Sequence, residues 1–251
     1  MFTGKQKVSA LPLVPVKTEV PFQQWGLDFI REIHPHSSAQ HKWILTATDY
    51  FTKRVEAIPT RNATDSVVIN FLEENILSIF DCPRKIVTDN AQAFKSMAMI
   101  SFCQKFNIIL GHSTTYYPQG NGLAESFNKS LITVIKKVLT ENKKPWHIHL
   151  KYALWDNRIS TKRSIGISPF QMVYGTDVIL PINLALPVMK LWKDSNEEPN
   201  NITKRENQLV EVQQNRAEVN EKLRRYQDKM KSLFDQKDKD RDFLPGDLVL
   251  K

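Results

Sequence analysis

Three acidic residues, Asp28, Asp89 and Glu125, stand where carboxylates from different elements could meet. Asp28 and Asp89 lie in or directly after runs of strand composition, and Glu125 follows Asp89 by 125 − 89 = 36 positions, at the start of a helical pattern. Converging carboxylates can hold two Mg²⁺ or Mn²⁺ ions, which clamp the attacking and leaving oxygens of a phosphodiester. The triplet therefore predicts metal-dependent phosphoryl transfer, with these acids as catalytic residues and metal ligands.

Each acid has a simpler explanation when taken alone. Asp28 could be a surface residue of an edge strand, although it stands among Trp25 and Leu27, where an unpaired carboxylate is costly. Asp89 could begin a turn, and Glu125 could serve only the helix dipole. The specificity lies in the three residues together.

The charge distribution points to a polyanionic partner. Lys and Arg number 35 against 27 Asp and Glu, which gives a formal net charge of +8. Residues 129–163 hold nine of the basic residues against Glu141 and Asp156, so that 9 − 2 = +7. A basic region beside an acidic metal site suits a phosphate chain, although a solvated helix face can have the same composition.

Hydrophobic periodicity predicts the elements that must position the acids. The predicted strands are 25–33, 42–50, 54–58, 85–88 and 108–110. The predicted helices are 65–80, 97–106, 123–139 and 146–160, with Pro118, Gly120 and Gly122 in a loop before the third. The segment 165–187, rich in Pro and Gly, is expected to be irregular. This order is typical of an α/β fold with a mixed five-stranded sheet flanked by helices.

Two stretches have the regular apolar spacing of amphipathic helices. In 65–80, the apolar residues Val68, Leu72, Ile76 and Phe80 recur at every fourth position after Thr64, the expected N-cap. Towards the C-terminus, steps of three and four join Leu209, Val212, Arg216, Val219, Leu223, Tyr226, Met230 and Leu233. The heptad pattern predicts a long helix that either pairs with a second copy or packs on the core, with Arg216 as its one polar position.

Five motifs follow one another between residues 22 and 187. They are Trp25-Gly26-Leu27-Asp28, Asp49-Tyr50-Phe51-Thr52-Lys53, Thr88-Asp89-Asn90, the stretch Tyr117 to Lys129, and the stretch Ser168 to Gly175. Together they resemble the motifs of retroviral and long-terminal-repeat retrotransposon integrases, especially the Ty3/gypsy-like branch. Each motif is weak alone, but their shared order makes coincidence improbable.

The resemblance implies a ribonuclease-H-like fold and DNA integration by a two-metal DDE polynucleotidyl transferase, which processes DNA 3′ ends and joins them to target DNA. It assigns two Mg²⁺ or Mn²⁺ ions to the three acids. It implies double-stranded DNA as partner, both element ends and target, and a homodimer or higher homo-oligomer. The DNA-binding positions that it implies are Gln119, Asn121, Asn128, Lys129 and Lys136. Lys129 fits an intrahelical ion pair with Glu125 equally well.

The same resemblance divides the chain into five parts. The expected parts are an extended lead-in at 1–21 after a missing zinc module, a catalytic core at 22–187, a linker at 188–202, a long helical segment at 203–242 and the truncated start of a β-barrel domain at 243–251.

Two departures from the family pattern favour an alternative. Ala91 stands where the family usually has Gly, at a position that could need unusual backbone angles, and the flanking domains are missing or cut. The alternative is a decayed or repurposed fragment that binds nucleic acid or dimerises without turnover. A ribonuclease H or another transposase of the same fold is a third candidate. Asn90 either orients a metal-bound water or caps the next helix.

The remaining features exclude several classes of protein. Cys82 and Cys103 form no CxxC motif, so neither a disulfide framework nor a thiolate zinc site is indicated. The pairs His34 with His36, and His147 with His149, are interpreted as surface or helix-face histidines. The sequence has no run of about eighteen apolar residues and no secretory signal, so we expect an intracellular protein without membrane contact. A nuclear location follows only from the DNA substrate.

Overall fold

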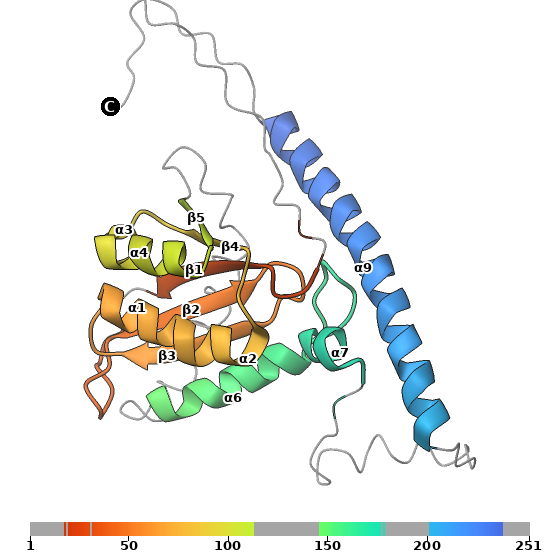
Figure 1. Ribbon diagram of the computed structural model, residues 1–251, viewed down its shortest axis with the longest axis horizontal. Coiled ribbons are helices and arrows are strands. Elements are labelled where there is room, and N and C mark those ends of the chain that lie inside the picture. The colour runs from red at the N-terminus through yellow and green to blue at the C-terminus, as the bar shows by residue number, and fades with distance from the viewer. Residues whose placement is uncertain are drawn as a thin grey trace, which may run out of the picture.

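The computed structural model describes residues 20–30, 32–112, 146–176 and 201–237, together with residues 18 and 178 (Figure 1). Within 201–237, side chains are described for 210–233. Several expectations fall outside these residues: the loop around Pro118, the helix at 123–139, most of the lead-in and linker, and the segment 243–251.

The centre of the molecule is one mixed sheet of five strands. They are β1 (Gln24–Ile30), β2 (Trp43–Asp49), β3 (Val55–Thr60), β4 (Lys85–Thr88) and β5 (Ile109–His112). The spatial order is β3-β2-β1-β4-β5, in which β1, β2 and β3 form an antiparallel meander while β4 and β5 run parallel to β1. The predicted α/β class and five-stranded mixed sheet are confirmed. Pro59 is tolerated within β3 because that strand lies at an edge of the sheet.

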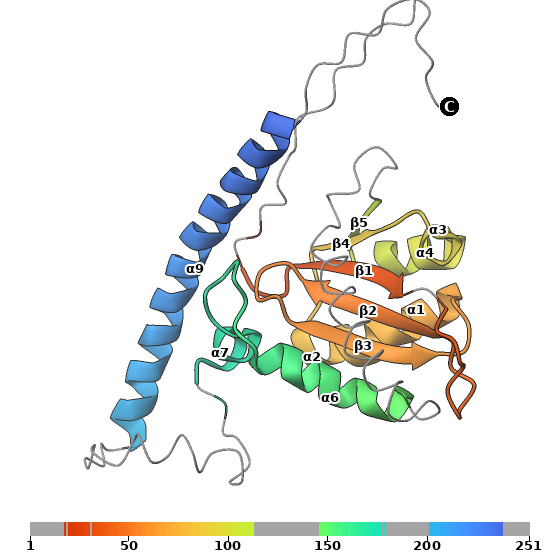
Figure 2. The same cartoon turned by 180° about the vertical axis from the view of Figure 1, so that it is seen from behind.

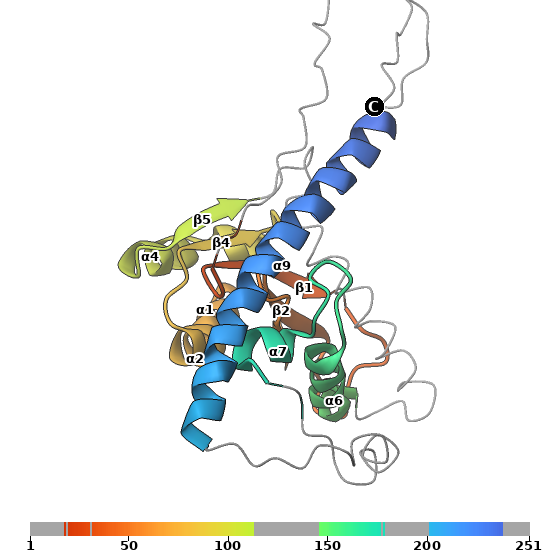
Figure 3. The same cartoon turned by 90° about the vertical axis from the view of Figure 1, so that its right-hand side faces the viewer.

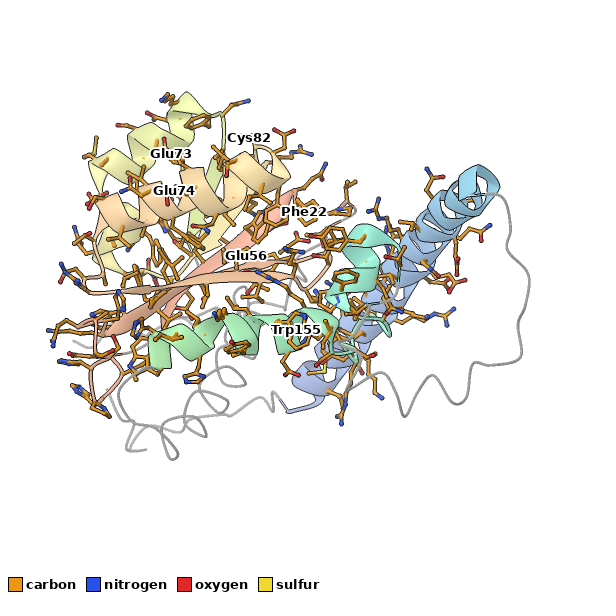
Figure 4. The ribbon with its side chains drawn as sticks, turned by 90° about the horizontal axis from the view of Figure 1, so that it is seen from below. Phe22, Glu56, Glu73, Glu74, Cys82 and Trp155 are labelled. Carbon is orange, nitrogen blue, oxygen red and sulfur yellow. The ribbon has the colours of Figure 1, made fainter. Side chains whose placement is uncertain are left out.

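Helices cover both faces of the sheet, as Figure 4 shows along the layers. One face carries a helical stretch made of α1 (Asp65–Phe71), η1 (Leu72–Leu77) and α2 (Ser78–Phe80), followed by α3 (Gln92–Lys95) and α4 (Met97–Lys105). The other face carries α6 (Trp146–Ile159), which runs beside β3 (Figure 2).

Alternation along the strands separates two cores. Trp25, Leu27 and Ile86 point towards α1 and α4, whereas Ile30 and Ile44 pack against α6. Successive side chains of a strand point to opposite faces, so each face obtains its own apolar layer.

The central turn of the first helical stretch, η1, is π-helical. Residues four apart advance about 40° beyond a full turn of an α-helix, so a strict four-residue repeat would rotate away from the sheet. A π-helical turn holds more residues, and Val68, Leu72 and Ile76 all remain buried. Glu73 and Glu74 lie exposed on the outer side (Figure 4).

The expectation of irregular structure throughout 165–187 is wrong for one segment, because α7 spans Pro169–Tyr174. Ser168 Oγ accepts a hydrogen bond from the Gln171 backbone N–H at 3.1 Å, and Gln171 Oε1 accepts one from the Ser168 N–H at 3.0 Å. Pro169 follows this capping box, and Gly175 ends the helix at φ 71°. The Ser-Pro-x-Gln sequence is a helix-start signal that the surrounding Pro and Gly obscured.

The predicted long C-terminal helix is confirmed as α9 (Asn201–Lys237), which passes beside α7 (Figure 3). Val219 and Leu223 are buried with Phe51 of the β2–β3 turn and Met172 of α7. The inner part of the heptad stripe therefore packs on the core.

Arg216, the polar position of the heptad, faces the end of α7. Its guanidinium donates to the Met172 carbonyl at 3.4 Å and to the Val173 carbonyl at 3.5 Å. Carbonyls at a helix C-terminus carry partial negative charge, so a cation is stabilising there. Beyond this contact the stripe is exposed: Tyr226 at 40%, Met230 at 46% and Leu233 at 43%.

Two further observations bear on protein class. No helix among the described residues has the length and apolarity required to span a membrane. Cys82 and Cys103 are both free thiols.

Candidate metal-binding active site

The parallel pairing of β1 and β4 places two of the predicted acids at the same end of adjacent strands. Gly26 pairs with Val87, Asp28 lies two residues further along β1, and Asp89 directly follows β4, which ends at Thr88. Neighbouring strands lie about 4.8 Å apart, so the same pairing, continued by two residues, would set Asp28 beside Asp89. Asp28 and Asp89 are both half-buried.

The surroundings of Asp28 differ from the sequence expectation. Trp25 and Leu27 belong to the opposite core, because strand side chains alternate between faces. Asp28 instead shares its face with Thr46 of β2, its register partner. The Thr46 hydroxyl donates to the Asp28 carbonyl at 3.1 Å, which fixes the backbone of β1 at this level.

Asp89 directly follows β4 and organises the start of α3. Its Oδ1 accepts the Ala91 backbone N–H at 2.9 Å, and its carbonyl accepts the Thr88 hydroxyl at 2.9 Å. One oxygen of the Asp89 carboxylate therefore stabilises a turn, as the simpler explanation of Asp89 expected. Ala91, rather than Asn90, is the N-cap of α3, at φ −61° and ψ 144°. Any L-residue adopts these angles, so Ala91 introduces no backbone strain.

Tyr50 is a neighbour of Asp28 that the sequence interpretation missed. Its side chain is only 2% exposed. Burial raises the pKa of Tyr50, and the negative charge of Asp28 raises it further. Tyr50 lies within the second family-like motif. It is four positions after Thr46, so in an extended chain both side chains point to the same face. This spacing could have identified Tyr50 from the sequence.

The β2–β3 turn holds a second, fully buried acid. The carboxylate of Asp49 accepts the Phe22 N–H at 3.1 Å, the Thr52 N–H at 2.8 Å and the Thr52 hydroxyl at 2.6 Å. Burial raises the pKa of Asp49 to about 6 despite these bonds. Lys53, at φ 62°, donates to the Tyr50 carbonyl, and burial lowers the pKa of Lys53 to about 8.

An ion-pair network connects β3 to the helices around it. Glu56 accepts from Arg54 Nε at 2.8 Å and from Arg158 Nη2 of α6 at 2.6 Å. Arg54 also donates to the Tyr174 hydroxyl at 3.2 Å. Glu56 alternates along β3 with Val55 and Ala57, which pack on the α6 side of the sheet. Arg158 is thus ion-paired within the fold, and its charge does not belong to a surface for phosphate.

The other predicted site residues lie outside the described residues. These are Glu125, the third acid, and Gln119, Asn121, Asn128, Lys129 and Lys136, the predicted DNA contacts. The structure therefore describes two members of the triplet, one on β1 and one directly after the adjacent strand β4.

The donor set at Asp28 and Asp89 fits a hard divalent cation. Both residues offer carboxylate oxygens, the ligands that Mg²⁺ and Mn²⁺ prefer. Two carboxylates brought close together repel one another, and a bound cation removes such repulsion.

Comparisons with known proteins relate this chain to integrase-containing sequences. Residues 19–118 match the family described as Integrase core domain. The Gag-Pol polyprotein of avian reticuloendotheliosis virus is 31% identical over 160 residues, which are 64% of this chain and 14% of that protein. The Transposon Tf2-3 polyprotein of Schizosaccharomyces pombe is 28% identical over 244 residues, 95% of this chain and 17% of that protein. The chain thus spans less than a fifth of the length of these relatives.

A solved structure shares the fold. It is a chain of the simian T-cell lymphotropic virus intasome in complex with PP2A regulatory subunit B56 gamma, with a TM-score of 0.58 and 21% identity over 78% of this chain and 65% of that one. The family match covers Asp28, Asp89 and all five strands. The resemblance to integrases is thereby confirmed for residues 19–118, which match the integrase core domain, and the chain shares the fold of a solved intasome chain.

Proposed function

We propose that this chain is the core of a retrotransposon integrase, a metal-dependent polynucleotidyl transferase that processes DNA 3′ ends and joins them to target DNA. The observation that carries the proposal is that Asp28 on β1 and Asp89 directly after β4, two adjacent parallel strands, both lie in the segment that matches the integrase core domain. The alignment of 95% of the chain with a transposon polyprotein supports an origin in a transposable element, and the Ty3/gypsy-like branch is proposed from the sequence motifs alone.

In this proposal Asp28, Asp89 and Glu125 hold two Mg²⁺ or Mn²⁺ ions. When bound, such a pair of ions neutralises phosphate charge and stabilises the attacking and leaving oxygens of an in-line displacement. Asp28 and Asp89 supply oxygen ligands from a rigid sheet, which fixes their separation. Tyr50 is buried close enough to Asp28 for the charge of that carboxylate to raise the pKa of Tyr50.

Double-stranded DNA is the proposed substrate, as element end and as target. Its proposed contacts are Gln119, Asn121, Asn128, Lys129 and Lys136, in and after the motif that includes Glu125. The net charge of +8 supports binding through counterion release. A nuclear location is proposed from this substrate alone.

The decisive experiment is a strand-transfer assay with a labelled DNA end and Mg²⁺. We expect Asp28→Asn and Asp89→Asn each to lower product formation by about 100-fold or more, the scale on which one charge-stabilising group contributes. Asp81→Asn is the matched control, because it removes one carboxylate charge at an exposed position before β4. It should retain wild-type activity.

Equal product from wild type and Asp89→Asn would refute the assignment. The alternative of a decayed fragment loses one of its arguments, since Ala91 has ordinary backbone angles. Calorimetry separates the two functions: the transferase binds Mg²⁺ and loses that binding in Asp28→Asn, whereas a fragment without turnover does not assemble the ion site. Hydrolysis of RNA in hybrids would favour a ribonuclease H instead.

We also propose that the chain self-associates through the outer part of α9. Tyr226, Met230 and Leu233 continue the heptad stripe beyond its contact with α7 and are 40–46% exposed. A second copy would bury them. Light scattering should report a dimer or larger assembly, and Met230→Lys should shift it towards monomer. A wild-type monomer at high concentration would contradict self-association.

A further inference from the structure

The segment that follows β1 gathers two histidines and a carboxylate. Glu32, His34 and His36 each offer a ligand atom, and these atoms all lie within 4.8 Å of one another. His36 Nε2 is 3.1 Å from Glu32 Oε1, and His34 Nε2 is 3.9 Å from Glu32 Oε2. Among the described residues this is the only such group of three.

These residues lie close together along the chain. They occupy every second position after the end of β1 at Ile30, and the chain bends at His34 and Pro35. The two imidazole rings lie with their centroids 5.1 Å apart. His34 and His36 are surface residues, as predicted, but they are joined through one carboxylate rather than separate.

A surface ion pair explains only part of this arrangement. It accounts for the 3.1 Å contact between His36 and Glu32, and such exposed pairs contribute little to stability. It does not account for two rings that both present Nε2 to the same carboxylate. Convergence of two nitrogens and one oxygen is the arrangement that a metal ion requires.

The spacing and donor types select a class of metal. Zn²⁺ binds His nitrogen and carboxylate oxygen at about 2.0–2.2 Å in a tetrahedral arrangement, so its ligand atoms lie about 3.3 Å apart. The separations of 3.1 and 3.9 Å bracket that value. Imidazole suits Zn²⁺, Cu²⁺ and Ni²⁺, whereas Mg²⁺ favours carboxylates and water. This group therefore differs in chemistry from Asp28 and Asp89.

We propose that Glu32, His34 and His36 form a binding site for a transition-metal ion of the Zn²⁺ class, separate from the acidic site on β1 and β4. The three residues supply three ligands and leave at least one position for water or another donor. The ion would close the loop between β1 and β2, whose base is held by the hydrogen bond from the Ile33 N–H to the Lys42 carbonyl at 2.7 Å.

The test is a Zn²⁺ titration of the full chain in competition with a chromophoric chelator at pH 7.5. We expect one ion per chain, with the affinity lowered about tenfold or more in His34→Ala/His36→Ala. The matched control is His147→Ala/His149→Ala, which removes two histidines of the same spacing from α6, where they are not joined through a carboxylate. It should bind like wild type, and equal binding by both double variants would overturn the proposal.

Two further measurements keep the result independent of folding and of strand transfer. Glu32→Gln preserves size and should also weaken Zn²⁺ binding, and acidification to pH 5.5 should weaken it in wild type because His ligands must be deprotonated. Asp89→Asn should bind Zn²⁺ at this site unchanged, whatever its strand-transfer activity. Binding that survives in Glu32→Gln and is lost in Asp89→Asn would place the ion at the acidic site and overturn the proposal.

Discussion

The sheet holds two kinds of acidic region, and they differ in what surrounds the carboxylate. Asp49, the last residue of β2, is fully buried and accepts three hydrogen bonds. Asp28 on β1 and Asp89 directly after β4 are both half-buried. A buried, hydrogen-bonded carboxylate supports the fold, whereas two acids placed side by side at partial exposure suit a cation. All three occur in family-like motifs, so motif membership alone does not separate these roles.

The largest effect on stability is expected for Asp49→Ala. The change leaves the Phe22 N–H and both Thr52 donors without their acceptor in a buried turn. We expect a loss of about 3 to 5 kcal/mol in the free energy of unfolding, measured in urea. Asp156→Ala on the exposed side of α6 is the control and should change stability by about 0.5 kcal/mol or less. Equal losses would show that Asp49 has no special role.

The same acid predicts a pH dependence. Burial raises the pKa of Asp49 in the folded chain from 3.8 to about 6, so the native state binds a proton that the unfolded state has released. This contribution is complete below pH 3.8 and is lost as the pH rises through 6, by up to about 3 kcal/mol. The difference in unfolding free energy between wild type and Asp49→Asn should therefore change between pH 4 and 6. A constant difference would mean that Asp49 titrates normally.

The β2–β3 turn also packs against α9 through Phe51. Substitutions at two glycines can test the packing of α9. A Cβ on Gly175 would lie 1.8 Å from Val212 Cγ2, whereas one on Gly166 would meet Lys222 atoms no closer than 3.6 Å. Both glycines have positive φ, so Gly166→Ala controls for backbone strain. We expect Gly175→Ala to cost about 1 to 3 kcal/mol more, because the clash must displace α9. Limited proteolysis should cut α9 faster in Gly175→Ala alone.

The smallest effect on stability is expected at the acidic site. Asp28→Asn and Asp89→Asn remove charge from half-buried positions, and the amide oxygen that Asp89→Asn introduces could still accept the Ala91 N–H. Unfolding free energies should remain within about 0.5 kcal/mol of wild type. A loss above about 2 kcal/mol would move these acids into the same class as Asp49 and end the contrast between the two regions.

Local patterns predicted most elements, but not the contacts between them. Period-two and helical patterns located all five strands and the helices at 65–80, 97–106 and 146–160, with shifts of a few residues at their ends. The neighbourhood of β1 and β4, which carry Asp28 and lead to Asp89, depends on pairing between residues 61 positions apart, as Gly26 with Val87 shows. No local pattern specifies such a register.

Other errors had identifiable causes. The Ser168 capping box was present in the sequence, but the Pro and Gly content around it suggested irregular structure. The partner of Arg216 could not be predicted, because the Met172 carbonyl lies 44 positions away along the chain. The strain expected at Ala91 does not occur, since the turn is made by the side chain of Asp89 rather than by positive φ.

The wide turn η1 determines where its helix ends. Because the middle of the helix has more residues per turn, Phe80 lies near the start of β1. Its ring centroid is 4.7 Å from that of Phe22 and 5.3 Å from that of Trp25. The guanidinium carbon of Arg54 lies 5.0 Å from the same ring. Deleting one residue from η1 would rotate Phe80 out of this aromatic stack. A single π-helical turn thus keeps the apolar side of the first helix facing the strands along its whole length.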